Sequence, residues 1–365
     1  MGGDAVLLFM YYSPISIRFL YPIWNDLWQF IIPGKENAYF NNTTKDHSGE
    51  KMQMDKITNN KTVKKIKTAL SLIKAPGKLI LPMGQNGLLN FVPDKLYLRC
   101  AFKAETGYPL DLKHPKTYNE KLQWIKLYDR KPEYVVYADK YKVREYIAAT
   151  IGDKYLVPII GMYRKAEEIR WSELPERFVL KCNHASGTNI VCKDKSKLDI
   201  SSTEKQLNAW LKKNAYWEAR EWCYKDIEPC IICEEFIETQ DGNTPDDYKF
   251  MCFNGVPKLI QVHHDRFGDH TLDYYTPRWE KATLQRIDAK VSTREISRPE
   301  KLDEMLSIAA KLSENMYYAR IDLYYVDGVI YFGEITMYPT GGFSTFVNHE
   351  DDLLLGSYIK LPTDN

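Results

Sequence analysis

The stretch ARIDLYYVDGVIYFGEITMYPTGG, residues 319–342, decides the fold. Two runs rich in β-branched and aromatic residues flank Asp327-Gly328, a pair typical of tight turns, so the stretch is predicted to form a β-hairpin. Each strand carries one acid among apolar neighbours, Asp322 and Glu334, and Arg320 lies two residues before the first acid. Two carboxylates in a half-buried hairpin require a chemical explanation.

The register of the hairpin determines whether the two acids meet. With a two-residue turn, Glu334 would lie on the opposite side of the sheet from Asp322. A three-residue loop, Val326–Gly328 with the glycine left-handed in a bulge, shifts the register by one residue. Asp322 then opposes Phe332, and Glu334 lies diagonally on the same face, roughly 5–8 Å away between Cβ atoms. We therefore expect the three-residue loop, which also places Arg320 on that face.

Two carboxylates at this separation can hold a divalent cation. Magnesium prefers oxygen ligands and typically takes one or two carboxylates together with substrate phosphates. Arg320 on the same face would meet a phosphoryl group. The alternative is an ion-pair cluster of Arg320, Asp322 and Glu334 on a solvated face, and the hairpin alone favours neither.

Composition excludes several classes of protein. The chain has 365 residues, enough for two or three domains. Its 50 basic and 49 acidic residues leave a net charge of +1, which favours neither nucleic acid nor a strongly acidic partner. Seven cysteines, an odd number, indicate a reducing cytoplasm rather than a disulfide framework. Cys230 and Cys233 form a single C-x-x-C in a strand-like run, so we expect buried thiols rather than a zinc ribbon.

The first part of the chain has a different character from the rest. Residues 1–33 are apolar and aromatic, but polar residues and prolines interrupt them, which predicts neither a membrane-spanning helix nor a signal peptide. An interfacial anchor, a partner-bound segment and a poorly ordered start stay open. Residues 34–61 are polar and predict a linker, so 1–61 is assigned as an N-terminal extension. Residues 62–76 predict a basic amphipathic helix that lies either on the inner face of a membrane, as a peripheral contact, or on its own protein.

From about residue 85 the pattern mixes helices and strand hairpins without a regular alternation, which is typical of an α+β fold. Helices are predicted from the capping box of Thr117 and Glu120, over about 138–150, from Ser201 with Glu204 through Trp210, and from Ser297 to about Asn315. Strands are predicted on both sides of a loop within 178–193, at 230–238, and in a hairpin at 247–265 that turns at Asn254-Gly255.

Two of these segments suit a nucleotide. In FVLKCNHASG, Lys181 ends a strand and enters a loop with Ser186 and Gly187, where a lysine and backbone N–H groups can cradle phosphates. His184 in this loop is either a phosphate contact or a packing residue. The strand-like run CIICEEFIE, 230–238, can offer backbone groups to an adenine edge.

In this order the segments resemble the ATP-grasp superfamily: DK before a helix, strand-lysine-loop, an EEFI strand, and R-x-D…E followed by Pro and Gly. KTYNEKLQW, DKYKVREYI, FVLKCNHASG, PDDYKF, FNGVPKLIQV, DRFGDHT and YFGEIT are similar, more closely, to the TupA-like (teichuronopeptide-biosynthesis) ATP-grasp family. The resemblance covers about 62–361 and implies two α+β subdomains that grip a nucleotide. They would be 139–238, with the phosphate loop, and 239–361, with the metal site, after a reduced and mainly helical region, 62–138.

The resemblance also implies roles for single residues. The residues expected to contact ATP phosphates are Lys140, Lys181, His184, Ser186 and Gly187. The adenine would pair with the backbone of Glu235 and Ile237, with Glu234 and Glu238 nearby. Magnesium would be held by Asp322, Glu334 and Thr336, although most ATP-grasp ligases have an asparagine where this chain has Thr336. The catalytic set would be Arg320 and Lys249, with the backbone of Gly341 and Gly342 as an oxyanion contact.

A third cluster lies downstream of the second predicted hairpin strand. Asp265, Arg266 and His270 are expected to line an acceptor pocket, with Arg266 as an anion contact. A zinc site formed with His263 and His264 is the alternative, but nothing in the spacing indicates zinc geometry.

The family resemblance implies an enzyme, a carboxylate–amine ligase that uses ATP and Mg²⁺ and proceeds through an acyl phosphate. Its substrates would be an amine and a sugar-acid or amino-acid carboxylate, in capsule or cell-wall polysaccharide biosynthesis in the cytoplasm. The alternatives are an ATP-dependent glycan kinase, a glycosyltransferase that uses a nucleotide-sugar, and a non-catalytic scaffold.

Overall fold

A computed structural model of the chain describes residues 76–239, 245–264, 270–293 and 295–364. The chain divides into two compact units, Met1–Leu79 and Ile80–Asn365. Of the first unit only the 3-10 turn Pro76–Leu79 is described, so the expected extension and all but the last residue of the expected basic helix lie outside the described residues. The second unit contains all of the described strands.

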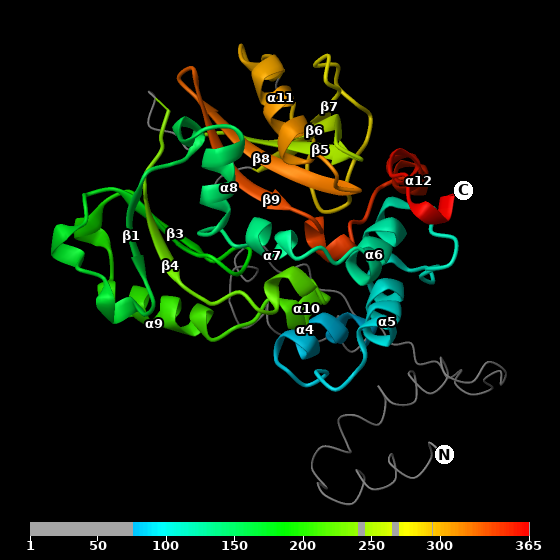
Figure 1. Cartoon of the computed structure of the whole chain (residues 1–365), viewed down its shortest axis with the longest axis horizontal. Coiled ribbons are helices and arrows are strands. Elements are labelled where there is room, and N and C mark those ends of the chain that lie inside the picture. Colours follow the sequence, from blue (N-terminus) through cyan, green and yellow to red (C-terminus); the bar gives the residue numbers. More distant parts are fainter. Residues whose placement is uncertain (1–75, 240–244, 265–269, 294, 365) are drawn as a thin grey trace, which may run out of the picture. The chain divides into compact units, whose positions relative to one another are not determined.

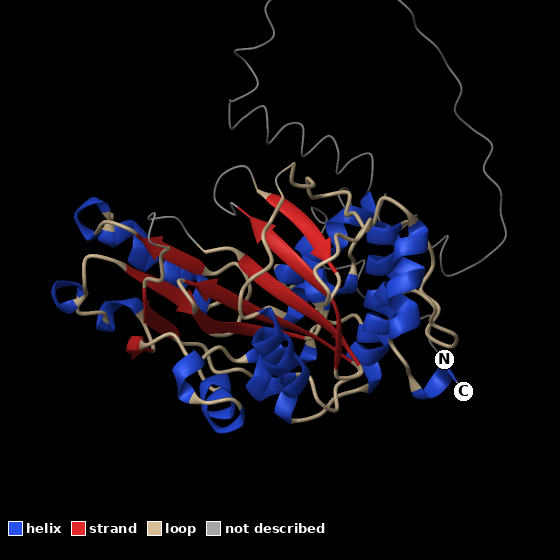
Figure 2. Cartoon of the chain, turned by 90° about the horizontal axis from the view of Figure 1, so that it is seen from above, coloured by secondary structure: helices blue, strands red, loops and turns tan. Residues whose placement is uncertain are grey.

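The second unit mixes helices and strands without a regular alternation, and Figure 2 shows the strands between groups of helices. The helices are α4 (Ile80–Gln85), α5 (Asp94–Thr106), α6 (Tyr118–Tyr128), α7 (Glu133–Ala138), α8 (Val143–Thr150), α9 (Ile200–Leu211), α10 (Tyr216–Ala219), α11 (Leu302–Leu312) and α12 (His349–Tyr358). The strands are β1 (Ile159–Tyr163), β2 (Phe178–Cys182), β3 (Asn189–Cys192), β4 (Ile231–Glu235), β5 (Asp247–Phe253), β6 (Val256–His264), β7 (Thr271–Tyr275), β8 (Tyr318–Val326) and β9 (Val329–Thr336).

In the described part of the chain these strands form two sheets. The four-stranded sheet has the order β1-β4-β2-β3, and the five-stranded sheet has the order β7-β6-β5-β8-β9. Every pairing between neighbouring strands is antiparallel. Figure 1 shows α11 lying across the five-stranded sheet and α9 beside the four-stranded one. The architecture is therefore the α+β type that the sequence predicts.

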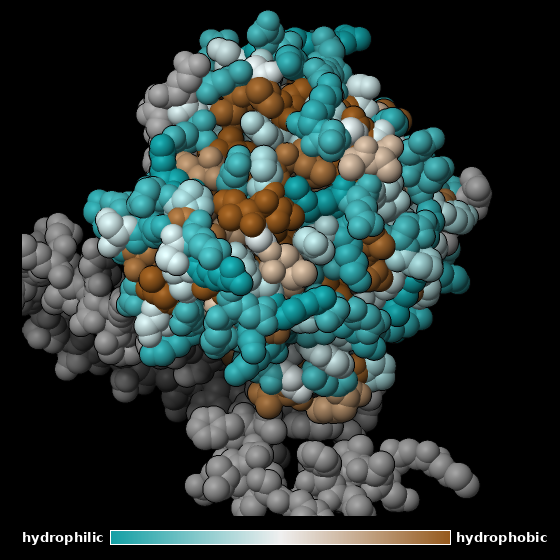
Figure 3. Space-filling model, turned by 60° about the vertical axis from the view of Figure 1, so that its left-hand side comes forward, coloured by the Kyte–Doolittle hydropathy of each residue, from teal (hydrophilic) through white to brown (hydrophobic). Residues whose placement is uncertain are grey.

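A membrane-spanning protein and a peripheral one differ in their helices and in their molecular surface. In the parts of the chain that the structure describes, no helix is both long enough and apolar enough to cross a bilayer. On the face shown in Figure 3, hydrophobic residues form separate patches between hydrophilic ones. A peripheral membrane contact through the basic helix stays a prediction, because residues 62–75 lie outside the described residues.

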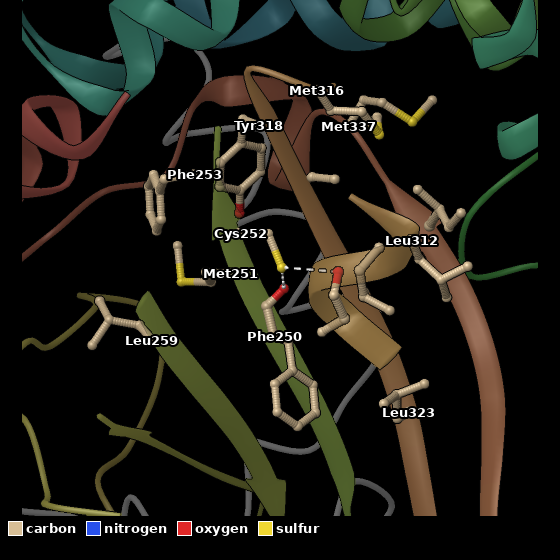
Figure 4. Close-up of a cluster of buried hydrophobic side chains, with 14 of the residues drawn as sticks. Phe250, Met251, Cys252, Phe253, Leu259, Leu312, Met316, Tyr318, Leu323 and Met337 are labelled. Carbon is tan, nitrogen blue, oxygen red and sulfur yellow. Dashed lines mark hydrogen bonds between the residues drawn. The ribbon is translucent and has the colours of Figure 1, made fainter. Parts of the chain in front are cut away.

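One face of the five-stranded sheet is apolar. Buried residues of α11 pack against β5, β6 and β8, as expected for an amphipathic helix on a half-buried sheet. The close-up in Figure 4 shows this cluster, in which the Cys252 Sγ donates to the Ala309 carbonyl at 3.7 Å and contacts the Phe250 carbonyl at 3.6 Å. Because side chains alternate along a strand, Lys249 points to the opposite face. Lys249 and its partner Asp322 on β8 therefore lie on the side away from α11, as does Arg320, which pairs with Met251.

The four-stranded sheet repeats this arrangement at smaller scale. Phe178, Leu180 and Cys182 of β2 are buried in a cluster that includes Leu207 of α9 and Cys233 of β4. All seven cysteines are free thiols, and the C-x-x-C pair is buried, as predicted. Residues between these positions on β2 and β4 point away from the apolar cluster.

Several local predictions are confirmed. The Thr117 Oγ1 accepts from the Glu120 N–H at 3.1 Å, and the Glu120 carboxylate accepts from the Thr117 N–H at 3.0 Å, so the capping box opens α6. The hairpin of β5 and β6 turns at Asn254-Gly255, where both residues have positive φ. These signals are local in sequence, which is why they could be read directly.

Three predicted helix starts are wrong by a few residues. Helix α8 begins at Val143 rather than near 138, because the Asp139 carboxylate accepts from two following backbone N–H groups, at 2.9 and 3.2 Å, and forms a turn. Helix α9 is capped by Asp199 rather than Ser201. Helix α11 begins at Leu302, later than the predicted start at Ser297.

Candidate active site

The hairpin of β8 and β9 turns through two residues, so the predicted three-residue loop is wrong. Val326 pairs with Val329, and the turn consists of Asp327 (φ 50°) and Gly328 (φ 82°). Two left-handed residues give a turn whose twist matches that of the flanking strands, which favours this geometry over a longer loop.

The register shift lies further along the hairpin, at Gly333. Leu323 pairs with Phe332, but Asp322 pairs with Glu334, so Gly333 is the extra residue of a β-bulge. A Cβ atom on Gly333 would lie 3.0 Å from the Asp322 carbonyl oxygen, a closer approach than side chains ordinarily make. The prediction that both acids share one face is confirmed. They are directly opposite rather than diagonal.

Arg320 contacts both acids. Its Nε donates to Asp322 Oδ1 at 2.6 Å and its Nη2 donates to Asp322 Oδ2 at 2.7 Å, a bidentate arrangement. The same Nη2 lies 3.2 Å from Glu334 Oε1 and 3.1 Å from Thr336 Oγ1. The Thr336 hydroxyl donates to Glu334 Oε1 at 3.1 Å. These four side chains form one hydrogen-bonded group on the face opposite α11.

Lys249 joins this group from the neighbouring strand. It pairs with Asp322 across β5 and β8, and its Nζ donates to Asp322 Oδ2. Asp247, two residues earlier on the same face, has its Oδ2 3.5 Å from the same Nζ. Lys249 and Asp322 are both buried, at 5% and 3% exposure, so their charges interact with little screening by water.

Lys140 connects this group to the other sheet. Its Nζ lies 3.4 Å from Glu334 Oε2 and donates to the Ala185 carbonyl, in the loop after β2, at 2.9 Å. Burial alone would raise the pKa of Glu334, but the charges of Lys140, Arg320 and Lys249 outweigh it and hold that pKa well below its usual range. Glu334 is therefore ionised at neutral pH and available to a cation.

The four-stranded sheet carries a second group of charges. The Lys181 Nζ donates to Glu234 Oε2 at 2.6 Å, and the Arg144 Nη1 lies 3.5 Å from Glu234 Oε1. Glu234 is buried, whereas the lysine side chain keeps 24% of its exposure. The buried carboxylate of Glu234 thus lies between the cations of Lys181, on β2, and Arg144, on α8.

The three residues of the loop after β2 that were predicted to contact phosphates differ in their exposure. Ser186 and Gly187 are exposed, and Gly187 has φ 70°. His184 is buried at 2% exposure, and its Nε2 lies 3.0 Å from the Lys213 carbonyl and 3.3 Å from the Trp210 carbonyl. Burial lowers the pKa of His184. These contacts favour packing against the end of α9 over phosphate binding for this histidine.

The EEFI segment has part of its backbone already engaged. The Glu235 N–H donates to the Pro158 carbonyl at 3.1 Å, so an adenine contact at this residue would have to use its carbonyl. Ile237 is half-buried just beyond the strand. The Glu238 carboxylate forms an ion pair with Arg177.

The two glycines predicted to bind an oxyanion lie in a 3-10 turn, Pro339–Gly342, which begins three residues after the last residue of β9. Thr340, Gly341 and Gly342 have φ of 50°, 64° and 72°, three left-handed residues in a row. The Gly341 N–H donates to the Tyr338 carbonyl at 2.8 Å, and the Gly342 N–H lies inside the same 3-10 turn, so the predicted oxyanion contact stays a prediction.

The histidines near the predicted acceptor pocket pair with one another. The His263 Nδ1 lies 2.9 Å from the His270 Nε2, and their rings stack with centroids 5.1 Å apart. Asp265 and Arg266 lie outside the described residues. Among the residues that are described, no group of three or more His, Cys, Asp or Glu side chains is placed to hold a metal ion, so the zinc alternative gains no support there.

Sequence reasoning assigned no role to Arg144 or Asp247, which are part of these groups. Each had a signal in its spacing. Arg144 lies four residues after Lys140 in the segment predicted as a helix. Asp247 precedes Lys249 by two residues, which places the aspartate and the lysine on one face of β5. Lys126, beneath the glycine turn, lacked such a signal, because its partners lie far away in sequence.

A family model described as TupA-like ATP-grasp matches residues 120–360, a range that contains both sheets and both charged groups. The chain belongs to the TupA-like ATP-grasp family. This confirms the family that the motifs predict and, with the two antiparallel sheets, the ATP-grasp fold. No curated protein matches the TupA-like chain.

Solved structures similar to the TupA-like chain include several ligases. D-alanine–D-alanine ligase from Bacillus anthracis is 18% identical over 55% of this chain and 57% of that one, with a TM-score of 0.34. The Helicobacter pylori D-alanine–D-alanine ligase is 13% identical over 67% and 69%, with a TM-score of 0.36. A RimK-domain ATP-grasp protein from Sphaerobacter thermophilus is 8% identical over 63% and 70%, with a TM-score of 0.34. The TupA-like chain spans little more than half the length of the Bacillus ligase.

Proposed function

We propose that the chain is a Mg²⁺- and ATP-dependent carboxylate–amine ligase that works through an acyl phosphate. The observation that carries the proposal is the pairing of Asp322 with Glu334 on one face, within 3.5 Å of Arg320, Lys249 and Lys140. The three cations would bind the negative triphosphate, and the two carboxylates would bind the positive divalent ion. The group therefore suits both ligands together.

The donor set fits magnesium. Asp322, Glu334 and Thr336 would supply oxygen ligands, and no larger cluster of metal-binding side chains exists among the described residues. Phosphates and water would complete the coordination, as magnesium sites commonly require. Both oxygens of Asp322 accept from Arg320 and Lys249, so these cations would turn to phosphate oxygens in the loaded site. The ion would neutralise charge on the transferred phosphoryl group.

The nucleotide would lie between the two charged groups. Lys181 and Lys140 would contact the phosphates, with Ser186 and Gly187 offering an exposed loop beside them. The backbone of Glu235 and Ile237 would pair with the adenine. Lys140 supports this placement, because it already contacts both the loop after β2 and Glu334.

In the reaction, a carboxylate oxygen of the acceptor attacks the γ-phosphorus, the bond from that phosphorus to the bridging oxygen breaks, and ADP leaves. The amine nitrogen then attacks the carbonyl carbon of the acyl phosphate, inorganic phosphate leaves, and the nitrogen loses a proton. Arg320 and Lys249 would stabilise the charge on the phosphoryl group, and the backbone of Gly341 and Gly342 would contact the oxyanion.

The resemblance to the teichuronopeptide-biosynthesis family supports a glycan setting. The carboxylate would belong to a uronic acid or an amino acid, and the product would be an amide in a capsule or cell-wall polymer. Asp265, Arg266 and His270 would line the acceptor pocket. The enzyme would act in the cytoplasm, with a peripheral membrane contact through 62–76.

The test is the Asp322→Asn variant, assayed for Mg·ATP turnover with candidate uronic and amino acids and amines, with products identified by mass spectrometry. We expect turnover to be lost while circular dichroism shows a folded protein. Asp327→Asn, in the exposed turn of the same hairpin, is the control and should keep full turnover. Retained turnover in folded Asp322→Asn would refute the site. Phosphate left on the glycan would identify a kinase instead.

A further inference from the structure

The connection between α4 and α5, residues 86–93, is an exposed apolar loop (Figure 1). Its outward side chains are Leu88 and Phe91, which are 62% and 78% exposed. Leu89 and Val92, each one residue further along, pack against the buried cluster that surrounds α5. The loop therefore presents two large apolar side chains to solvent, while its other apolar residues belong to the core.

The loop has a defined shape. The Asn90 N–H donates to the Gly87 carbonyl at 3.3 Å, which forms one tight turn. The Val92 N–H donates to the Leu89 carbonyl at 3.1 Å, which forms a second. The side chain of Phe91 thus projects from a folded, hydrogen-bonded turn.

A buried arginine fastens the loop to a distant part of the chain. Arg220, the residue after α10, is fully buried, and its Nη2 donates to the Leu89 carbonyl at 2.6 Å. Its guanidinium carbon lies 4.3 Å from the centroid of the Tyr97 ring and 4.8 Å from that of the Trp217 ring. Such cation–π contacts stabilise a charge that is removed from water. The base of the loop is therefore fixed by the core, although its tip is apolar and exposed.

The helix that follows the loop adds positive charge beside it. The charged residues of α5 are three bases and two acids: Lys95, Arg99, Lys103, Asp94 and Glu105. Lys95 and Arg99 are exposed, and neither forms an ion pair within the described part of the chain. Asp94 is engaged by Arg130 at 3.1 Å, and Glu105 is half-buried. The exposed charge next to the loop is therefore positive.

An apolar tip beside exposed bases suits an anionic bilayer better than a protein partner. Stable protein interfaces bury roughly 800 Å² on each partner, more than the tip of one short loop offers. A membrane interface accepts a few apolar side chains at shallow depth, and its anionic headgroups attract lysine and arginine. The surface with matching chemistry is therefore that of an anionic phospholipid bilayer.

We propose that the loop 86–93 docks the protein on an anionic phospholipid bilayer, with Leu88 and Phe91 inserted at the interface and Lys95 and Arg99 against the headgroup phosphates. This loop is separate in sequence from the predicted contact through 62–76. The proposal goes beyond the proposed function, because it concerns where the protein is held and not the reaction that it catalyses.

The test measures how the full chain partitions onto sedimented vesicles of phosphatidylcholine alone and of phosphatidylcholine mixed with phosphatidylglycerol. The double variant Leu88→Ser/Phe91→Ser removes the apolar tip. The matched control, Ile287→Ser/Val347→Ser, exchanges two other exposed apolar side chains of the second unit. Circular dichroism verifies that each variant is folded.

The wild type should bind the mixed vesicles more tightly than phosphatidylcholine, and less tightly as salt is added. Leu88→Ser/Phe91→Ser should lower the partition coefficient by about tenfold or more, because two large apolar side chains no longer leave water. The control should keep the wild-type value. Hydrogen exchange of the 86–93 peptide should slow in the wild type when mixed vesicles are added.

A second variant tests the contribution of charge. Lys95→Gln/Arg99→Gln should lower binding to the mixed vesicles by about tenfold, since each base near an anionic surface contributes to binding. Its weaker binding to phosphatidylcholine alone should not change. Equal binding of this variant and the wild type to the mixed vesicles would overturn the assignment of an anionic surface.

Three other results would overturn the proposal. The first is a wild-type chain that does not bind the mixed vesicles. The second is equal partitioning of the wild type and Leu88→Ser/Phe91→Ser, which would leave segment 62–76 to account for the binding. The third is exchange at 86–93 that is slow without vesicles and unchanged by them, which would show that protein already covers the loop. None of these measurements uses ATP turnover, so their failure is distinguishable from failure of the proposed function.

Discussion

The two sheets carry charged groups of different composition. On the four-stranded sheet a single buried carboxylate, Glu234, lies between Lys181 and Arg144. On the five-stranded sheet two carboxylates face each other and share the guanidinium of Arg320. An excess of cations around one acid suits the binding of phosphates, whereas paired acids among cations suit a metal ion and a moving charge. We therefore propose that the four-stranded sheet has a binding role and the five-stranded sheet, with its paired carboxylates, a reacting role.

The largest effect should come from exchanging one acid in each group. We expect Glu334→Gln to lower Mg·ATP turnover by about 10²–10³-fold, the range for losing one preorganised electrostatic contact. Glu234→Gln should lower turnover by only about tenfold, because it disturbs a lysine rather than a metal ligand. Steady-state kinetics of the two variants provide the measurement. Equal losses would remove the distinction between the groups.

A smaller effect is expected for the lysine of the binding group. Lys181→Met should raise the Kd for Mg·ATP about tenfold, as expected for the loss of one hydrogen bond to a charged group. Lys193→Met, an exposed lysine of the same sheet region, is the matched control and should bind normally. Calorimetric titration with Mg·ATP measures both. An unchanged Kd in Lys181→Met would argue that Lys181 serves only its ion pair with Glu234.

The bulge between the two acids should contribute modestly to stability. Gly333→Ala places a Cβ 3.0 Å from the Asp322 carbonyl oxygen, so the strand must shift slightly. We expect the free energy of unfolding to fall by about 1–3 kcal/mol, the usual cost of overpacking, in urea titrations. A variant as stable as the wild type would show that this part of the hairpin is looser than its register indicates.

The smallest effect concerns pH. The folded-state pKa of Glu334 is depressed, so its ionised form stabilises the fold above the pKa of the unfolded chain, and this contribution is lost as pH falls toward the folded pKa. The difference in melting temperature between wild type and Glu334→Gln should therefore be largest near neutral pH. It should shrink below about pH 5. A difference that grows on acidification would contradict the assignment.

Local signals predicted most of the elements that carry the site. The capping box, the Asn254-Gly255 turn and the strand-lysine-loop segment each depend on residues close in sequence. The shared face of Asp322 and Glu334 could also be predicted, because two acids that act in one site must point to the same side of the sheet. The requirement that both acids face one metal ion predicted the shared face correctly, although the predicted three-residue loop is wrong.

The remaining features depend on contacts between distant residues. Lys181 contacts Glu234, and Lys126 contacts Gly341, although the partners are far apart in sequence. No periodic pattern in the sequence could predict these contacts. In the sequence Gly333 is one residue of a strand-like segment. The pattern therefore could not distinguish a bulge at Gly333 from a three-residue turn at Val326–Gly328. The start of α8 was displaced because the Asp139 carboxylate satisfies nearby N–H groups itself, in competition with the helix.

The bulge at Gly333 matters because the number of positions between two residues of a hairpin, odd or even, determines whether they share a face. In an unbulged hairpin with a two-residue turn, residues on one face are separated by an odd number of positions across the turn, whereas Asp322 and Glu334 are separated by an even number. Two acids that share a face at an even interval around an Asp-Gly turn therefore require a bulge. Lengthening this hairpin by two residues would keep the acids on one face, whereas a change of one residue would need a second change to compensate.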